Sequence, residues 1–386
     1  PSCMDILDES IVPERALPIK REAREFAEEV IEPAAEEQYE SGEYPWEVLE
    51  AGMQANLVAQ DIPEEYGGRG LDLAQTLAMT EELYRADAGI ALTLQLASFG
   101  AEVIYEYGTE EQIDEYIRPV ADHEQITGLA VSEPDTGSDL AGMTTTAEKN
   151  GDEWVLNGEK YWVGNAVEAD WLTLYAKTGG GDNRYEDYSM FIVPTDAPGY
   201  NAEHIPEKMS FRASKQGHIV LDDCRIPAEN LVGDEGEGFF MVTDFFNHGR
   251  VGVAGHGLGL AAAAIEEASA FVHDRDAWGQ SVSEFQAVQH DLSEMCMDFE
   301  SARALAWRAA ENVEEDTNPG YWAALAKTTA TEAAVDCAES AMQLHGGRSV
   351  LKENKISRVY RDVRVPVIYE GANNIQRDLI YGQADW

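Results

Sequence analysis

A carboxylate near the C-terminal end of the chain, Glu370, lies in a context that suits acid–base chemistry. Aliphatic residues recur through the segment Val363–Ile368 before it, and Gly371 follows it. Pro366 interrupts any helix through this segment, because proline lacks a backbone N–H and restricts the residue before it. A carboxylate at such a break can enter an apolar pocket, where desolvation makes it a stronger base. Most glutamates are solvated, so a plain surface residue is the simpler interpretation of this segment alone.

Two segments in the middle of the chain combine turn formers with groups that can contact a ligand. Residues 130–139 (Ala-Val-Ser-Glu-Pro-Asp-Thr-Gly-Ser-Asp) carry short hydroxyls and a turn rich in backbone N–H groups, which suit an anionic or carbonyl-rich ligand. An ordinary β-turn with Asx and serine contacts explains the same composition. Residues 157–165 (Asn-Gly-Glu-Lys-Tyr-Trp-Val-Gly-Asn) place Trp162 either against a ligand or in the core.

Two motifs in the last third of the chain suit a diphosphate. Arg-x-x-Trp-Gly begins at Arg275 and is followed by Gln286. A guanidinium offers paired donors to a diphosphate, and glutamine can satisfy a phosphate or a ring edge. Arg275 can equally pair with an adjacent aspartate. A Gln-Leu-His-Gly-Gly run begins at Gln343 and, taken alone, is a glycine cap at the end of a helix.

Together these motifs resemble the acyl-CoA dehydrogenase family, as do the Tyr-Glu-Gly around Glu370 and the Ile-Gln-Arg four residues beyond its glycine. The resemblance covers nearly the whole chain, with the motifs in the family's order. It implies FAD-dependent α,β-dehydrogenation of an acyl-CoA thioester to a trans-2-enoyl-CoA. Glu370 would remove the α-proton while flavin N5 accepts the β-hydrogen as hydride. Electrons would pass to an electron-transfer flavoprotein, and the assembly would be a homotetramer, a dimer of dimers.

The resemblance also assigns binding residues. The cofactor contacts carried over from the matching motifs are Val131, Ser132, Gly137, Ser138, Trp162, Val163, Gly164, Arg275, Trp278, Gln286, Gln343, Gly346, Gly347, Ala372 and Asn374. The substrate contacts are Ser138, Asn247, Arg250, Gly371 and, at the pocket floor, Gln95. The motifs around Arg275 and Gln343 would hold the ADP half of FAD across a subunit interface, and Arg250 would help to hold the phosphates of CoA.

Four positions depart from the family pattern. Gly164 and Ala372 stand where threonines usually contact the flavin, so two hydroxyl contacts are lost and the flavin's potential or position is expected to change. Ser349 replaces a glycine, which puts a close backbone approach to the cofactor in doubt there. Trp278 replaces a phenylalanine and keeps the aromatic role.

The position of the base follows from a comparison within the family. Some members carry the base immediately before the residue that matches Arg250, and here that residue is Gly249, so the base is assigned to Glu370. The pocket floor is expected in the helix Ala88–Phe99. No cation lies there, which argues against a dicarboxylyl substrate and leaves short, medium, branched and aromatic acyl groups open.

Two other functions remain open at this point. An acyl-CoA oxidase-like enzyme would use the same base but pass its electrons to O2. A non-enzymatic, DNA-binding relative of the family would need a basic groove. The chain has no basic cluster, so nucleic-acid binding is not expected.

Three segments with different sequence patterns must position these residues. Residues 1–126 are predicted to be an α-helical domain, with helices at Leu71–Tyr84 and Ile90–Tyr107 and a capping box formed by Thr109 and Gln112. Residues 127–238 contain short strand-like runs between close turns and predict a β-barrel or β-sandwich domain. Residues 239–386 predict a C-terminal four-helix-bundle domain, in which the Gly- and Ala-rich stretch Val251–Phe271 is central. The expected fold class is therefore α+β multidomain.

Charge is the most unusual property of the 386-residue chain. There are 73 acidic against 27 basic residues, which gives a formal net charge of −46. Because such self-repulsion is screened over a few ångströms in concentrated salt, the composition predicts a halophilic protein.

Other sequence features bear on location and metal binding. The four cysteines, Cys3, Cys224, Cys296 and Cys337, form no C-x-x-C pair, so neither disulfides nor a metal site are expected, and Cys296 and Cys337 suit the core. The chain shows no evident membrane-length apolar run, and residues 1–10 lack the layout of a signal peptide. These features predict a cytoplasmic protein without a membrane span.

Overall fold

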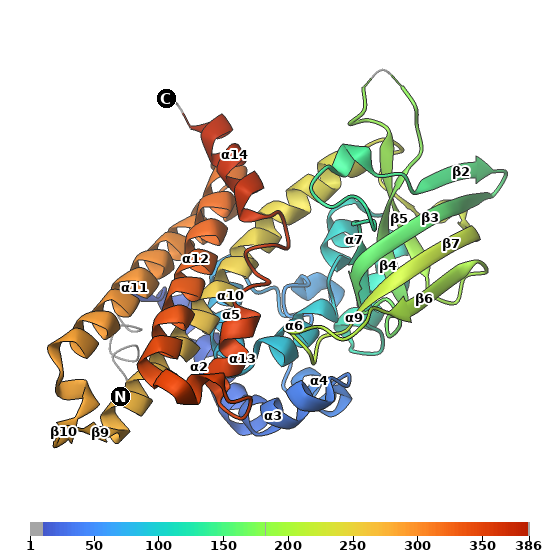
Figure 1. The fold of residues 1–386 in the computed structure, drawn as a ribbon. Coiled ribbons are helices and arrows are strands. Elements are labelled where there is room, and N and C mark those ends of the chain that lie inside the picture. Colours follow the sequence, from blue (N-terminus) through green and yellow to red (C-terminus); the bar gives the residue numbers. More distant parts are fainter. Residues whose placement is uncertain (1–10, 182, 385–386) are drawn as a thin grey trace.

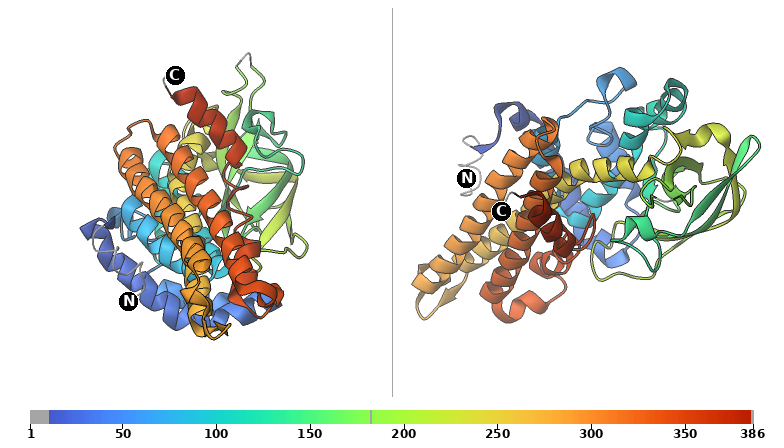
Figure 2. Two further views of the ribbon diagram at one scale, coloured as in Figure 1. Left: turned by 60° about the vertical axis from the view of Figure 1, so that its left-hand side comes forward. Right: turned by 90° about the horizontal axis from the view of Figure 1, so that it is seen from above.

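The computed structural model describes residues 11–181 and 183–384, and the predicted α+β multidomain fold is confirmed (Figure 1). A helical N-terminal part packs beside a β domain, and long C-terminal helices extend away from the sheet, as the turned views also show (Figure 2). The predictions for Cys3 and for residues 1–10 lie outside the described residues. Cys337 and Cys224 are buried, Cys296 is partly buried, and none of the three forms a disulfide among the described residues.

The N-terminal part consists of short helices around α5. Its elements are η1 (Glu14–Ala16), α2 (Leu17–Phe26), η2 (Ala27–Ile31), α3 (Glu32–Ser41), α4 (Trp46–Gln54), η3 (Glu64–Tyr66), α5 (Leu73–Ala86), α6 (Ala88–Leu96), α7 (Ala101–Tyr107), α8 (Glu110–Gln112), η4 (Ile113–Ile117) and α9 (Arg118–Ala121). The predicted capping box is present: Gln112 N donates to Thr109 Oγ1 (3.3 Å) and Thr109 N donates to Gln112 Oε1 (3.0 Å). This start signal is local, so the sequence alone revealed it.

The predicted helix Ile90–Tyr107 is wrong as a single element, because the chain breaks between α6 and α7. Gly100 takes a left-handed φ of 93°, and its carbonyl accepts a hydrogen bond from Thr173 Oγ1 (2.9 Å). The Ala97 carbonyl accepts one from the backbone N–H of Thr127 (2.8 Å). The β domain thus takes the carbonyls that a continuous helix would have used, and the break fastens the two parts together.

The same region contains an apolar stretch that the sequence analysis did not single out. By length and composition the stretch Ala88–Tyr107 is apolar enough to cross a membrane, with a mean hydropathy of 1.3, although none was expected. However, 72% of its apolar window is buried inside the fold. This stretch is therefore apolar because it lies in the protein core.

The middle part is an eight-stranded sheet that folds over on itself. Its strands are β1 (Thr127–Ala130), β2 (Thr146–Asn150), β3 (Glu153–Gly164), β4 (Trp171–Lys177), β5 (Tyr188–Pro194), β6 (Tyr200–His204), β7 (Gln216–Pro227) and β8 (Leu231–Val232). The order is β6-β7-β3-β2-β4-β5-β8, with β1 parallel to β4. Only one residue pair, Thr146 and Lys177, joins β2 to β4. A separate core that includes Trp154, Leu174 and Phe191 draws on both halves, as in a sandwich.

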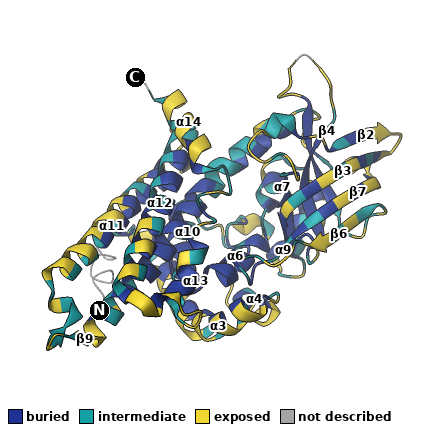
Figure 3. Cartoon of the chain, in the orientation of Figure 1, coloured by how far each residue is buried: buried dark blue, intermediate teal, exposed yellow. Residues whose placement is uncertain are grey.

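The C-terminal part is built on three long helices. Its elements are α10 (Gly238–Asp274), the hairpin β9 (Asp276–Ala277) and β10 (Gln280–Ser281), α11 (Gln286–Glu314), α12 (Pro319–His345), η8 (Gly346–Val350), α13 (Lys355–Asp362) and α14 (Asn373–Gln383). Helix α10 is central, as predicted, and its middle is buried (Figure 3). A β-carbon at Gly257 would lie 2.6 Å from the Ala330 backbone, and one at Gly259 would lie 2.5 Å from the Glu81 carbonyl. Glycine is therefore what lets α12 and α5 pack closely against α10.

Candidate active site

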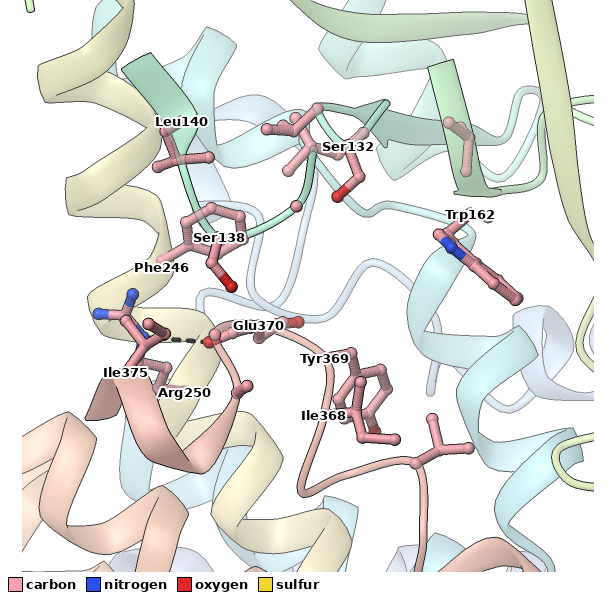
Figure 4. Close-up of a pocket in the computed structure, with 18 of the residues that line it drawn as sticks. Ser132, Ser138, Leu140, Trp162, Phe246, Arg250, Ile368, Tyr369, Glu370 and Ile375 are labelled. Carbon is pink, nitrogen blue, oxygen red and sulfur yellow. Dashed lines mark hydrogen bonds between the residues drawn. The ribbon is translucent and has the colours of Figure 1, made fainter. Parts of the chain in front are cut away.

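A cavity of about 1020 Å³ lies where the β domain meets the helices (Figure 4). Its walls come from the turn Ser132–Leu140, the end of β3, the first half of α10 and the segment between α13 and α14. Leu92, Leu96 and Phe99 add an apolar wall. The cavity brings together these predicted residues: Val131, Ser132, Gly137, Ser138, Trp162, Val163, Gly164, Asn247, Arg250, Glu370, Gly371 and Ala372. It therefore joins motifs more than 200 residues apart.

A buried ion pair fixes the first turn. Lys160 Nζ donates to the Val131 carbonyl (2.8 Å) and to Glu133 Oε1 (3.1 Å), and the backbone N–H groups of Thr144 and Thr145 donate to Glu133 (both 2.8 Å). Burial raises the pKa of Glu133, but Lys160 and these N–H groups outweigh it and lower the pKa to about 2. Burial likewise lowers the pKa of Lys160 to about 8, against the charge of Glu133. These contacts stabilise the turn that carries Ser132 and Ser138.

The end of β3 supplies an aromatic wall. Trp162 leaves 60% of its surface exposed and has a left-handed φ of 65°, while the adjacent Tyr161 N–H donates to the Ser132 carbonyl (2.8 Å). A β-carbon at Gly164 would lie 2.6 Å from Leu96 Cδ1. The space that a threonine side chain would need at position 164 is thus occupied by Leu96, which gives the departure at Gly164 a packing reason.

Glu370 extends into the cavity from a strained turn. Its φ is 50° and that of Gly371 is 90°, although left-handed backbone is unfavourable for a glutamate. Its Oε2 accepts no hydrogen bond from the residues that the structure describes. A β-carbon at Gly249 would collide with this oxygen, so glycine is what makes room for the carboxylate. Burial raises the pKa of Glu370 to about 7, against the opposing charges of Arg250 and Lys327.

Arg250 and Asn247 lie directly beside this turn. The guanidinium is buried; its Nε donates to the Glu370 carbonyl (3.2 Å) and its Nη1 to Asn247 Oδ1 (3.3 Å). It also lies over the Phe246 ring, 5.7 Å from the centroid. Arg250 thus holds the turn that carries Glu370 through one donor and Asn247 of its own helix through another, while it also lines the cavity.

Gln95, expected at the pocket floor, does not line the cavity. Its Oε1 accepts hydrogen bonds from Tyr84 OH (2.9 Å) and His256 Nε2 (2.8 Å), and its Nε2 donates to Thr80 Oγ1 (2.8 Å). The other ring nitrogen of His256 bonds to the hydroxyl of Tyr369, and Tyr84 stacks on His256 at 4.0 Å. Burial lowers the pKa of His256 to about 3. Gln95 is therefore part of a neutral network behind Tyr369.

The remaining predicted residues lie apart from the cavity. Asn374 is exposed in the first turn of α14. Those of the two diphosphate motifs are exposed at the far end of the long helices: Arg275, Trp278, Gln286, Gln343, Gly346 and Gly347. Stacking of Phe271 on His345 at 4.4 Å brings the two motifs to the same end. Ser349 is buried and its hydroxyl donates to the Gly346 carbonyl (2.7 Å).

Residues that sequence reasoning missed lie beneath the cavity. Lys327 of α12 donates to the Gly371 carbonyl (2.9 Å), and Gln376 of α14 donates to the same oxygen (3.0 Å). The only sequence signal was the single lysine in the alanine-rich stretch Ala323–Ala334, which an exposed helix face explains equally well.

Known proteins resemble this chain along nearly its whole length. Models described as the N-terminal, middle and C-terminal domains of acyl-CoA dehydrogenase match residues 13–124, 128–224 and 236–384. The chain is 36% identical to "Probable acyl-CoA dehydrogenase YngJ" of Bacillus subtilis (strain 168), over 95% of this chain and 96% of that protein. It is 35% identical to the mitochondrial short-chain specific acyl-CoA dehydrogenase of Mus musculus, over 96% and 90%.

A solved structure agrees. Butyryl-CoA dehydrogenase from Megasphaera elsdenii superposes with a TM-score of 0.92 at 30% identity, covering 96% of this chain and 98% of that one. The chain therefore belongs to the acyl-CoA dehydrogenase family, whose members are FAD-dependent oxidoreductases that act on acyl-CoA.

Proposed function

We propose that this protein is an acyl-CoA dehydrogenase that converts an acyl-CoA thioester to its trans-2-enoyl-CoA, with Glu370 as the base. One observation carries the proposal: a carboxylate without a hydrogen-bond donor on Oε2, among the described residues, faces a ligand-sized cavity with its pKa raised to about 7. An ionised but poorly solvated carboxylate is suited to take a proton from carbon near neutral pH.

The residues around the cavity fit FAD. Trp162 presents an exposed ring to a planar ligand, the Ser132–Ser138 turn offers hydroxyls, and Ala372 lies at the cavity wall directly before α14. The cavity volume of about 1020 Å³ lies just above the range for a single small-molecule site, about 300–1,000 Å³. When bound, FAD supplies a two-electron acceptor for hydride.

Groups of the chain itself would accept the α-proton and stabilise the negative charge that develops on the thioester oxygen. Glu370 accepts the α-proton on its unpaired carboxylate, and Gly249 leaves the space in which that carboxylate moves. The backbone N–H of Glu370 donates to no acceptor among the described residues, so it is available to the thioester oxygen. A donor placed there stabilises the negative charge that develops as the proton leaves.

A second copy of the chain completes the cofactor site in this proposal. Arg275 directly follows the last residue of α10 and is 25 residues from Arg250, which corresponds to about 37 Å along a helix, too far for one flavin ring to contact both. Trp278 is 93% exposed at the far end. A homo-oligomer, as a dimer of dimers, would bring this end to a neighbour's cavity, where Arg275 would meet the diphosphate.

The acyl group in this proposal is short. The cavity reaches α6, but none of the α5 residues, all of which the structure describes, lines it. Behind Tyr369 the hydrogen-bonded network of His256, Gln95 and Tyr84 fills the space. A longer chain would have to break these buried hydrogen bonds. The names of the mouse and Megasphaera relatives, short-chain specific and butyryl-CoA dehydrogenase, agree with a small acyl pocket.

An anaerobic titration of the protein, purified in high salt with FAD, tests the function. We expect butyryl-CoA to bleach the flavin absorbance, octanoyl-CoA to do so at least about tenfold more slowly, and palmitoyl-CoA to have no effect. A bound flavin that no acyl-CoA bleaches would overturn the dehydrogenase proposal. Bleaching by palmitoyl-CoA would overturn only the short-chain assignment.

The electron acceptor is tested separately. We expect the reduced enzyme to be reoxidised rapidly by an electron-transfer flavoprotein and slowly by O2. Oxygen consumption that keeps pace with turnover would instead identify an oxidase.

A further inference from the structure

Helix α12 places a lysine in the protein interior directly beneath the turn that carries Glu370. Lys327 is fully buried, and its Nζ donates to the Gly371 carbonyl (2.9 Å) and to Asn373 Oδ1 (2.7 Å). Burying a lysine is costly unless its donors are satisfied. Both acceptors lie in the segment 371–373, so the ammonium group is committed to the base-bearing turn.

Side chains on two sides of the strained turn donate hydrogen bonds to its main-chain carbonyls. Arg250 Nε donates to the Glu370 carbonyl (3.2 Å), while Lys327 and Gln376 (3.0 Å) both donate to the Gly371 carbonyl. Hydrogen bonds from charged donors are about twice as strong as neutral ones. Two buried cations therefore stabilise the left-handed turn, and neither is hydrogen-bonded to the carboxylate.

Helix α12 also fixes the start of α14. Asn373 Nδ2 donates to Thr331 Oγ1 (3.1 Å) and to Glu332 Oε1 (3.2 Å). The side chain of Asn373 thus bridges Lys327 and the next turn of α12. A shift of α14 would have to break these contacts together with those of Gly371.

The charged groups around the turn come from three helices. Glu370 interacts with Arg250 of α10, Lys327 of α12 and, repulsively, Glu102 of α7, while Lys327 also interacts with Glu332. The neutral His256 of α10 lies close enough for its pKa to be lowered further by Lys327. Burial lowers the pKa of Lys327 to about 7, and the charge of Glu370 opposes this.

We propose that Lys327 is a positioning residue: its ammonium group holds the Glu370–Gly371 turn through the main chain and contributes positive charge near a carboxylate that stays unpaired. This role rests on the proposed function, because it concerns the proposed base. A direct ion pair would hold the carboxylate ionised and draw it away from a substrate. Contact through the backbone places the base while leaving its oxygens available for a proton.

The test compares Lys327→Met with the wild type by infrared difference spectroscopy across pH. The carboxylic C=O band of Glu370 is identified by its loss in Glu370→Gln. Because the charge of Lys327 favours ionised Glu370, its removal should move the midpoint upward by about one pH unit. The ascending limb of kcat against pH should move by the same amount. The maximal kcat should fall about 10–100-fold, since a base displaced by 1 Å costs about this much.

Two further variants separate the charge from the hydrogen bonds. Gln376→Met removes the neutral donor to Gly371, so we expect kcat to fall while the infrared midpoint stays in place. Lys352→Met removes a lysine from an exposed position and should change neither quantity. If Lys327→Met yields no folded protein, Lys327→Gln, which loses the charge and keeps an amide donor, gives the same pH test.

The outcomes also distinguish this proposal from the proposed function. An unshifted infrared midpoint in the Lys327 variants would overturn the role of Lys327, whatever the enzyme does. Absence of flavin bleaching in the wild type would overturn the dehydrogenase function, while the infrared titration would still report whether Lys327 acts on Glu370.

Discussion

The two ends of α10 carry two groups of motif residues with opposite surroundings. Near its start, Arg250 is buried against the turn of Glu370, and the cavity around it is assembled within one chain. Beyond its end, Arg275 and Trp278 are exposed, and the glycines that follow α12 lie at the same end. The first group makes a nearly complete site for the proposed proton transfer. The second resembles half of a binding site, which a second copy of the chain would complete.

The contrast between the two ends of α10 predicts that substitutions at one end affect catalysis and substitutions at the other affect assembly. Changes at the cavity end should alter the rate of flavin reduction without altering the oligomeric state. Changes at the far end should alter FAD affinity and assembly, but leave the rate per bound flavin in place. Of the three substitutions below, Gly249→Val and Arg275→Ala test this separation, and Gly164→Thr tests the packing of the cavity wall.

Among these three, the largest effect is expected for Gly249→Val. Its branched side chain would occupy the space of Glu370 Oε2 and displace the carboxylate. We expect flavin bleaching by butyryl-CoA to slow by about 100-fold or more, with FAD content unchanged. Gly252→Val on the same helix is the matched control, because a β-carbon there meets no described atom within 4 Å beyond its chain neighbours and the adjacent backbone of its own helix. Equal rates in the two variants would contradict the placement of the base.

A smaller effect is expected for Gly164→Thr. The new side chain would meet Leu96, so we expect the free energy of unfolding to fall by about 1–3 kcal/mol. Leu96→Ala in the same chain should relieve the overpacking, and a double-mutant cycle by denaturant titration measures that coupling. Strictly additive effects would mean that Leu96 does not occupy this space.

The smallest effect is expected at the far end. Arg275→Ala should weaken FAD binding by about tenfold, which corresponds to about 1.4 kcal/mol. Titration of FAD into the apoprotein in high salt measures the affinity, and sedimentation reports the assembly. Arg225→Ala, an exposed arginine paired with Glu153 on the sheet, is the control. The proposal of a shared site would be wrong if the protein is a monomer and Arg275→Ala binds FAD with the affinity of the wild type.

The sequence predicted the elements and motifs whose signals are local. The strand-like runs between close turns, the Thr109 cap and the Gly- and Ala-rich stretch of α10 are local signals, and the structure contains the corresponding elements. The resemblance to the family predicted that Ser132, Trp162 and Glu370 share one site, and all three line the cavity. The net charge of −46 concerns the solvent-facing surface, and adaptation to high salt stays a prediction.

Features that depend on contacts distant in sequence could not be predicted. The helix break before Gly100 exists because strands β1 and β4 bond its carbonyls. Gln95 turned away from the cavity because His256 and Tyr84 offer it buried partners. The place of Lys327 depends on the packing of α12 beneath α14, for which the sequence carries no periodic signal.

The most direct test of the central claim is the rate of anaerobic flavin bleaching in Glu370→Gln. The amide keeps the size of the side chain and removes the base, so FAD and butyryl-CoA should still bind. We expect bleaching to slow by about 1,000-fold or more, within the range that general-base catalysis supplies. Bleaching at the wild-type rate in this variant would show that another group removes the proton, and the assignment of Glu370 would be wrong.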